Sequence, residues 1–130
     1  MQMRLALLAA VLCLYVAPTL FAQDAVKVDP KHYTVATENE QVRVLKVHYG
    51  AHEKSVMHSH PDSVAVFLSD AKGQFTFPDG KTQAFDVKAG DTQFSPANTH
   101  LPENTGDNAF DVVVVELKGK TDKSASMKKK

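Results

Sequence analysis

Turn-forming residues interrupt the chain roughly every eight to twelve residues from Tyr33 onward, and this spacing constrains the fold more than any other feature. The segments between the turns are rich in valine, phenylalanine and threonine, and none has the periodicity of an amphipathic helix. We therefore predict an all-β domain. Its expected strands cover residues 42–49, 64–68, 74–77, 82–87, 92–95 and 109–117.

One turn and one apolar run make the expected fold more specific. The sequence Pro78-Asp79-Gly80 predicts a hairpin, because proline presets one turn torsion and glycine accepts a positive φ. The unbroken apolar run 112–115 is typical of a strand covered on both faces. Together these features favour a small sandwich or closed barrel of the jelly-roll type. The phenylalanines are expected in its core, namely Phe75, Phe77, Phe85, Phe94 and Phe110.

The N-terminal residues have the pattern of an export signal. Arg4 precedes an apolar stretch over residues 5–16, and a turn-prone segment ends at the small residue Ala22. We predict a signal peptide over residues 1–22, with cleavage near Ala22, and hence a secreted or periplasmic protein. An uncleaved membrane anchor is the alternative. The remaining 130 − 22 = 108 residues are enough for one core, which we place in a domain over residues 23–117.

Charge and cysteine content exclude several classes of function. Arg4 is the one charged residue of the signal, so the mature chain has 15 − 1 = 14 basic and 15 acidic residues, and no basic field suggests nucleic acid. We expect no stable membrane association after cleavage. Cys13, the single cysteine, leaves with the signal, so histidine must carry any metal chemistry. Residues 118–130 are expected to form a basic, flexible tail, or alternatively to bind an anionic surface.

Three histidines in two separated segments are the candidate ligands of a metal ion. His58 and His60 flank Ser59, and His100 follows in the segment 96–100. Side chains two residues apart on a strand point to the same face, about 6.6 Å apart along the chain, whereas on a helix they would diverge. An extended segment would therefore let His58 and His60 converge on one ion. The other histidines, His32, His48 and His52, are expected at the surface without a role.

The order of these residues resembles that of a single-domain cupin. Gly50, His58, His60 and Gly73 follow the first cupin motif, and Gly90, Pro96, His100 and Asn104 follow the second. The resemblance covers about residues 33–117. It implies a jelly-roll barrel, or double-stranded β-helix, whose two motifs lie on facing strands. It also implies that His58, His60 and His100 point into the mouth of the barrel as ligands.

The chain departs from the cupin pattern at two positions that affect the site. Asn98 stands where the second motif has glycine, and Val64 or Ala65 stands where the first motif has a glutamate ligand. Three neutral imidazoles would leave the charge of a divalent ion uncompensated, which favours an anionic ligand and admits iron, zinc, copper or nickel. Substitutes for the lost oxygen ligand could come from Asp62, Gln93 or Glu103.

These observations predict an exported cupin that binds one divalent metal ion through His58, His60 and His100 and accepts a small molecule. One form of this function is a mononuclear oxygenase acting on a small anionic or carbonyl-containing substrate, with Glu103 as the candidate catalytic acid or base. The alternatives are a non-catalytic module that binds a metal or small ligand, and a metal-free structural homodimer. The chain contains no nucleophile elbow, phosphate-binding glycine loop or metalloprotease helix.

Overall fold

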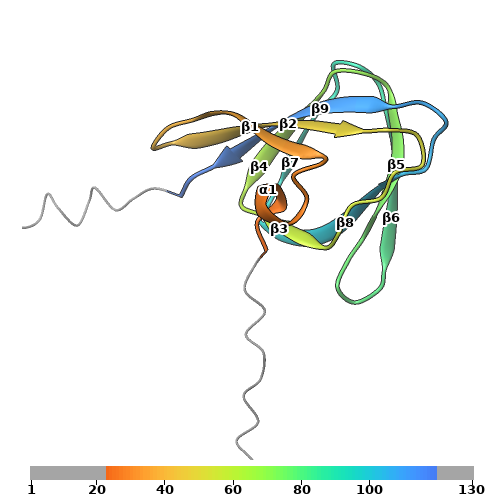
Figure 1. The fold of residues 1–130 in the computed structure, drawn as a ribbon, viewed down its shortest axis with the longest axis horizontal. Coiled ribbons are helices and arrows are strands. Elements are labelled where there is room, and N and C mark those ends of the chain that lie inside the picture. Colours follow the sequence, from red (N-terminus) through yellow and green to blue (C-terminus); the bar gives the residue numbers. More distant parts are fainter. Residues whose placement is uncertain (1–22, 120–130) are drawn as a thin grey trace, which may run out of the picture.

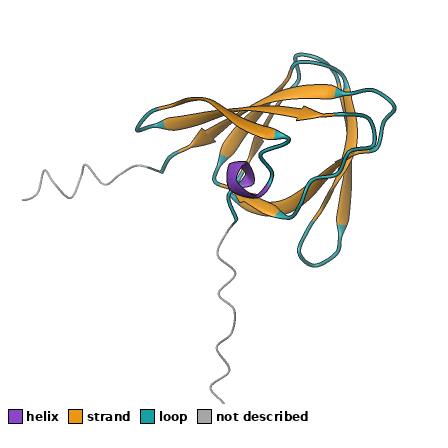
Figure 2. Cartoon of the chain, in the orientation of Figure 1, coloured by secondary structure: helices purple, strands orange, loops and turns teal. Residues whose placement is uncertain are grey.

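The computed structural model describes residues 23–119, which form mainly strands and one short helix (Figure 2). No helix among these residues has the length and apolar character needed to cross a membrane. The predicted signal peptide and most of the predicted tail lie outside the described residues. The elements are α1 (Ala25–Val28), β1 (Tyr33–Glu38), β2 (Val42–Tyr49), β3 (His58–His60), β4 (Ser63–Phe67), β5 (Ala71–Thr76), β6 (Thr82–Val87), β7 (Thr92–Ser95), β8 (Asn98–Asn104) and β9 (Phe110–Leu117).

The strands form two antiparallel sheets that enclose the interior of a barrel (Figure 1). The five-stranded sheet has the order β1-β2-β9-β4-β7, and the four-stranded sheet has the order β3-β8-β5-β6. This arrangement confirms the predicted all-β jelly-roll class. Three strands, β2, β6 and β7, have the predicted bounds. The structure adds β1, β8 and the short helix α1, which were not predicted.

The hairpin between β5 and β6 is formed as predicted. Phe77 donates its backbone N–H to the carbonyl oxygen of Lys81 over 2.9 Å, which closes the turn. Gly80 has a φ of 83°, in the left-handed region that glycine adopts without a steric penalty. Earlier in β5, Gly73 lies opposite Phe85, and a Cβ at Gly73 would overlap the Phe85 ring and the carbonyl oxygen of Glu103.

Alternation along the strands decides which residues form the core. In β9, Val112 and Val114 face the interior and Val113 and Val115 face outward, so the barrel covers this apolar run on one side. The prediction that the strand containing residues 112–115 is covered on both of its faces is therefore wrong. The core placement of Phe94 is also wrong, because this side chain points outward from β7 and is 58% exposed. Buried apolar residues include Leu45, Val47, Phe67, Phe110 and Val112.

Gln23 and Asp24 pair with β3, which is an edge strand of the four-stranded sheet. The carbonyl oxygen of Gln23 accepts the backbone N–H of Ser59 over 2.7 Å, and Asp24 and Ser59 form a parallel bridge. Asp24 also caps α1 by accepting the backbone N–H of Val26. Both carboxylate oxygens of Asp24 accept hydrogen bonds from the guanidinium of Arg43 at 2.8 Å. This segment therefore connects β3 to β2 of the other sheet.

Candidate metal centre

The antiparallel pairing of β3 and β8 brings the three predicted ligands together. His58 is the register partner of His100, and His60 is the register partner of Asn98. Each of the three histidines offers one ring nitrogen to the cluster, and these atoms lie within 4.8 Å of one another. His58 and His60 are buried, and His100 is half-buried. The extended conformation expected for residues 58–60 is confirmed.

Hydrogen bonds behind the rings orient His58 and His60. Nδ1 of His58 donates to the carbonyl oxygen of Val56 over 2.8 Å, and Nδ1 of His60 donates to Oε1 of Glu116 over 2.7 Å. A neutral imidazole carries one N–H, so in both residues Nε2 is left with a free lone pair. A hydrogen bond of this kind fixes the tautomer and the ring orientation that a metal ligand needs.

One ring nitrogen shows that a divalent ion fits this cluster. Nε2 of His58 is buried and has no hydrogen-bond partner among the described residues. A buried acceptor without a partner is costly, whereas metal coordination would use its lone pair. Nitrogens that share an ion at about 2.1 Å lie about 3 to 3.5 Å apart. Binding would therefore draw the three rings together from the present limit of 4.8 Å.

The electrostatic environment keeps the imidazoles of His58 and His100 neutral. Burial, with a smaller contribution from the neighbouring His60, lowers the pKa of His58 to about 4. Burial likewise lowers the pKa of His100 to about 3, with smaller contributions from His60 and His58. Metal ligation needs the neutral form. The protein therefore presents His58 and His100 in the ligand-competent state at neutral pH.

Glu116 is an acidic partner of the site that the sequence reasoning missed. Its side chain is buried, and its second oxygen accepts a hydrogen bond from Nε of Arg43 over 2.6 Å. Burial would raise the pKa of Glu116, but the hydrogen bonds from His60 and Arg43 outweigh this effect and the pKa is lowered. A carboxylate thus stands directly behind His60, where it is shared between this imidazole and the Arg43 guanidinium. Alternation along β9 could have revealed it, since Glu116 continues the inward positions 112 and 114.

The three proposed substitutes for the missing glutamate lie in different surroundings. Gln93 lines the cavity beside the histidines. Glu103 lies between the inward-facing residues 102 and 104 of β8, so it points away from the cavity, where it accepts a hydrogen bond from Gln74 over 3.1 Å. Asp62 accepts the backbone N–H of Ala97 over 2.8 Å at the surface. Among the three, Gln93 is the one that faces the site.

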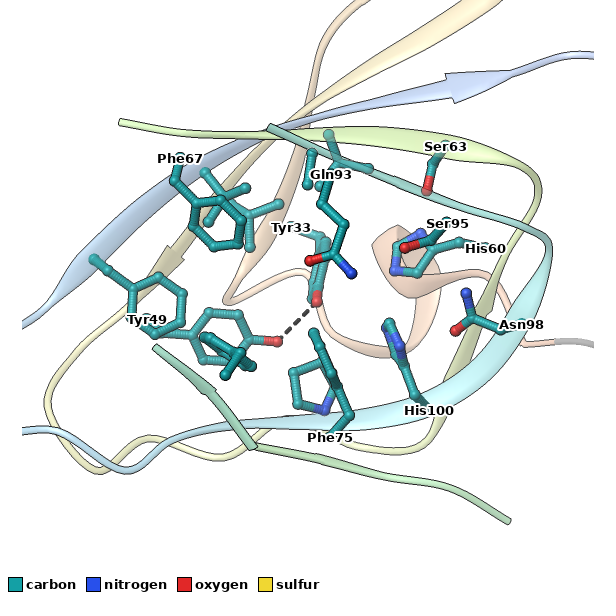
Figure 3. A pocket seen from close by; sticks show the side chains of 17 residues that line it. Tyr33, Tyr49, His60, Ser63, Phe67, Phe75, Gln93, Ser95, Asn98 and His100 are labelled. Carbon is teal, nitrogen blue, oxygen red and sulfur yellow. Dashed lines mark hydrogen bonds between the residues drawn. The ribbon is translucent and has the colours of Figure 1, made fainter. Parts of the chain in front are cut away.

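A cavity of about 90 Å³ extends from the histidines into the barrel. Figure 3 shows its polar side chains, including His60 and His100, gathered at one end and its aromatic walls at the other. The Phe75 ring stacks on His100 with a centroid separation of 4.8 Å. The hydroxyl groups of Tyr33 and Tyr49 are paired at 2.8 Å, and burial raises the pKa of both phenols. No lysine, arginine, aspartate or glutamate is among the described residues that line this cavity.

His32 lies in the interior and not at the surface, which corrects the expectation for this residue. Its Nδ1 is 2.7 Å from Asp29, its Nε2 is 2.7 Å from Glu53, and its ring stacks on Tyr49 at 4.3 Å. Ser55 connects this group to the site, because its hydroxyl donates to Asp29 and lies 3.3 Å from Nδ1 of His58. His32 therefore supports the wall behind the site.

Comparisons with known proteins agree with this architecture. The sequence matches no protein-family model and no curated protein. Among solved structures, a cupin domain from Bordetella pertussis Tohama I is 22% identical, with 77% of this chain and 99% of that chain covered and a TM-score of 0.63. A protein from Klebsiella pneumoniae with a double-stranded β-helix domain is 23% identical, with 68% and 76% covered and a TM-score of 0.55. An RmlC-like cupin family protein from Methanocaldococcus jannaschii is 18% identical, with 68% and 83% covered and a TM-score of 0.53. The described chain thus has the double-stranded β-helix fold of the cupins.

Proposed function

We propose that this protein is an exported cupin that binds one divalent metal ion through His58, His60 and His100. The buried, unpartnered Nε2 of His58 is the observation that carries this proposal. It lies in a cluster of three imidazoles whose potential ligand atoms are within 4.8 Å of one another. Imidazole suits zinc, copper, iron and nickel, and Glu116 behind His60 supplies a negative charge for any of these cations.

The cavity beside the cluster supports binding of a small organic molecule. A bound metal would supply a Lewis acid and a template at the polar end. Side chains of the cavity would bind the molecule: Phe75 and its aromatic neighbours would exclude water, and Gln93 would offer its amide to a polar group of the ligand. The leading enzymatic form is a mononuclear oxygenase acting on a small carbonyl-containing or anionic substrate. The alternative is non-catalytic storage of a metal or small ligand.

Metal binding can be tested directly. Protein purified without an affinity tag should contain, or take up in a calorimetric titration, about one equivalent of zinc or cobalt per chain. His58→Ala and His100→Ala should lose this binding. His48→Ala is the matched control, because His48 lies on the exposed face of β2 and pairs with Asp111. Absence of stoichiometric metal in the unmodified protein, or its retention in both ligand variants, would contradict the proposal.

Oxygen consumption distinguishes the proposed oxygenase from the non-catalytic binding protein. The iron-loaded protein should consume oxygen with at least one member of a panel of diketones, phenols and thiol acids. Glu103→Gln should leave this rate unchanged, because the carboxylate points away from the cavity and accepts a hydrogen bond from Gln74. A lowered rate would instead support Glu103 as the acid or base. A complete absence of oxygen uptake with iron bound would favour the non-catalytic form.

Export is proposed from the leader predicted over residues 1–22. Cleavage near Ala22 would leave Gln23 at the new N-terminus, directly before the capping residue Asp24. Mass spectrometry of the chain recovered from outside the cytoplasm should therefore give a mass that begins at Gln23. A recovered chain that retains residues 1–22 would support the membrane-anchor alternative.

The outer face of the five-stranded sheet favours association of two copies. Cross-strand pairing joins Val44 to Val115, Val115 to Val64 and Val64 to Phe94 in one outward row, and Val113 to Val66 in the next. Lys46 and Asp111 on the same face offer both signs of charge at one end, so the face can pair with a second copy of itself across a two-fold axis. We propose that this face mediates a homodimer, with or without metal.

Light scattering can test this pairing. The unmodified chain should have the mass of a dimer, and Phe94→Glu or Val113→Lys should give the mass of a monomer. Ala84→Glu is the control, because Ala84 is exposed on β6 of the other sheet. A monomeric unmodified chain would contradict the proposed dimer and leave the metal proposal intact.

A further inference from the structure

Asn98 has a buried oxygen atom without a partner beside the metal centre. Within residues 23–119, the buried side-chain nitrogen and oxygen atoms that lack a hydrogen bond are Nε2 of His58 and Oδ1 of Asn98. Asn98 is the register partner of His60 across the β3–β8 pair, and its side chain lines the same cavity. In Figure 3 the carboxamide oxygen of Asn98 lies on the side that faces His100. Asn98 therefore lines the same cavity as His60 and His100, which form the histidine cluster together with His58.

The orientation of the Asn98 carboxamide is set by its nitrogen. Nδ2 donates to the carbonyl oxygen of Pro96 over 2.8 Å. Exchange of the amide nitrogen and oxygen would place two oxygens against each other, so the oxygen must take the position that faces the cavity. That oxygen can only accept. An unpartnered buried acceptor destabilises the folded protein, so its presence in the lining of a cavity points to a ligand that satisfies it.

The chemistry of the cavity defines what this ligand must carry. Nε2 of His58 offers a lone pair suited to a metal ion, and Oδ1 of Asn98 offers a lone pair suited to a hydrogen atom. The phenol hydroxyls of Tyr33 and Tyr49 are paired with each other. The complementary ligand is therefore one whose metal-binding atom stands next to an O–H or N–H group. A bare anion without a hydrogen would leave the Asn98 oxygen unsatisfied.

The walls of the cavity restrict the rest of the ligand. They are mostly apolar, with aromatic rings from Phe67, Phe75, Phe85 and Phe110, and the volume of about 90 Å³ suits a molecule of only a few non-hydrogen atoms. The described lining residues include no lysine or arginine to hold a polyanion. These features select a small, weakly polar body with one polar end.

We propose that Asn98 is a specificity-determining residue that accepts a hydrogen bond from a protic ligand held at the histidine cluster. The site would then prefer small chelators that keep an O–H or N–H group beside the coordinating atom, such as hydroxamates or α-hydroxy ketones, over ligands of the same shape that lack this hydrogen. This inference rests on the proposed metal-binding function. Asn98 stands where the cupin resemblance has glycine, so the preference is a property of this chain.

A matched pair of ligands tests the proposal. Acetohydroxamate and N-methylacetohydroxamate present the same chelating oxygens, but the second lacks the N–H group beside them. Both are titrated into the cobalt-loaded full chain, whose visible absorption reports ligand binding. The unmodified protein should bind acetohydroxamate about tenfold more tightly, which is the effect of one hydrogen bond. Asn98→Leu, which is nearly isosteric, and Asn98→Ala should each abolish the preference.

Two controls accompany this titration. Cobalt affinity should be unchanged in both variants, because Asn98 is assigned to the ligand and not to the metal. Azide, which has no hydrogen when bound as an anion, should bind equally to all three proteins. Equal affinities for the two hydroxamates in the unmodified protein, or a preference that survives both substitutions, would overturn this inference alone. Failure of the unmodified protein to bind cobalt would overturn the proposed function as well.

Discussion

Glu116 and His60 are 56 positions apart in the sequence, yet the carboxylate of Glu116 lies 2.7 Å from Nδ1 of His60. Both side chains are buried, and Arg43 occupies the other carboxylate oxygen at 2.6 Å. A carboxylate in this position raises the basicity of a ligating imidazole and holds its ring in place. The candidate metal centre therefore depends on β9 of the opposite sheet as well as on the two strands that carry the histidines.

Replacement of Glu116 by glutamine should weaken metal binding by about 10- to 100-fold, because a neutral amide polarises the His60 imidazole less than a carboxylate does. A chelator-competition titration with zinc measures this change. Asp107→Asn is the matched control, since the Asp107 carboxylate lies 2.8 Å from Nε2 of His52 at the surface and belongs neither to the site nor to the proposed dimer face. If both variants lost zinc affinity equally, the loss would come from lower stability of the protein and not from the position of Glu116 behind His60.

The metal-free protein should lose stability as the pH falls from about 6.5 toward 4. His58 and His100 have pKa values of about 4 and about 3 in the folded protein, below the ordinary value of 6.5, so the unfolded chain binds more protons in this interval. Each histidine should contribute on the order of 2 kcal/mol to the loss at pH 4. Urea unfolding at several pH values measures it. His58→Gln and His100→Gln should flatten the pH dependence, whereas the surface variant His48→Gln should not.

Replacement of a candidate ligand and replacement of a core residue should have different effects. His100→Ala widens an existing cavity, so the metal-free protein should remain folded but gain no stability from zinc. The unmodified protein should gain about 2.7 kcal/mol at a zinc concentration 100 times its dissociation constant. Val112→Ala removes buried methyl groups and should cost about 2 kcal/mol with or without zinc. An apo His100→Ala protein that unfolds as readily as Val112→Ala would show that His100 is structural.

Gly73→Ala should destabilise the barrel, because the added Cβ would overlap the Phe85 ring and the backbone oxygen of Glu103. The backbone oxygen lies on the paired strand β8 and cannot move without disturbing the sheet. We expect a loss of about 1 to 3 kcal/mol in the free energy of unfolding. Gly119→Ala is the control, since nothing lies within 4 Å of a Cβ at that position. Equal stability of the two variants would mean that β5 and β8 can separate locally at no cost.

Local patterns in the sequence predicted much of the fold. Turn residues and apolar runs identified β2, β6, β7 and the hairpin at Gly80, because these signals act over a few neighbouring residues. The spacing of His58 and His60 predicted that both would face one side of a strand. The resemblance added His100, and the β3–β8 register explains why it completes the cluster.

Contacts between distant strands escaped prediction. Alternation along β9 places Glu116 on the inner face, but no local pattern reports that this strand of one sheet brings it within reach of His60 on β3 of the other. His32 is buried because Asp29 and Glu53 satisfy both of its ring nitrogens, and these partners come from different segments. Phe94 was misplaced because its apolar character was weighed without the alternation that turns Gln93 and Ser95 inward.

The short strand that carries two of the three histidines forms one border of its sheet. An uncovered border strand exposes backbone donors and acceptors that can recruit other chains into aggregates. Residues 23 and 24 occupy that border here, since Gln23 accepts the Ser59 N–H and Asp24 is tied to Arg43. Gln23 and Asp24 thus cover the edge strand β3. A shortened chain that starts beyond Asp24 would expose the backbone of this strand, and we expect such a chain to self-associate.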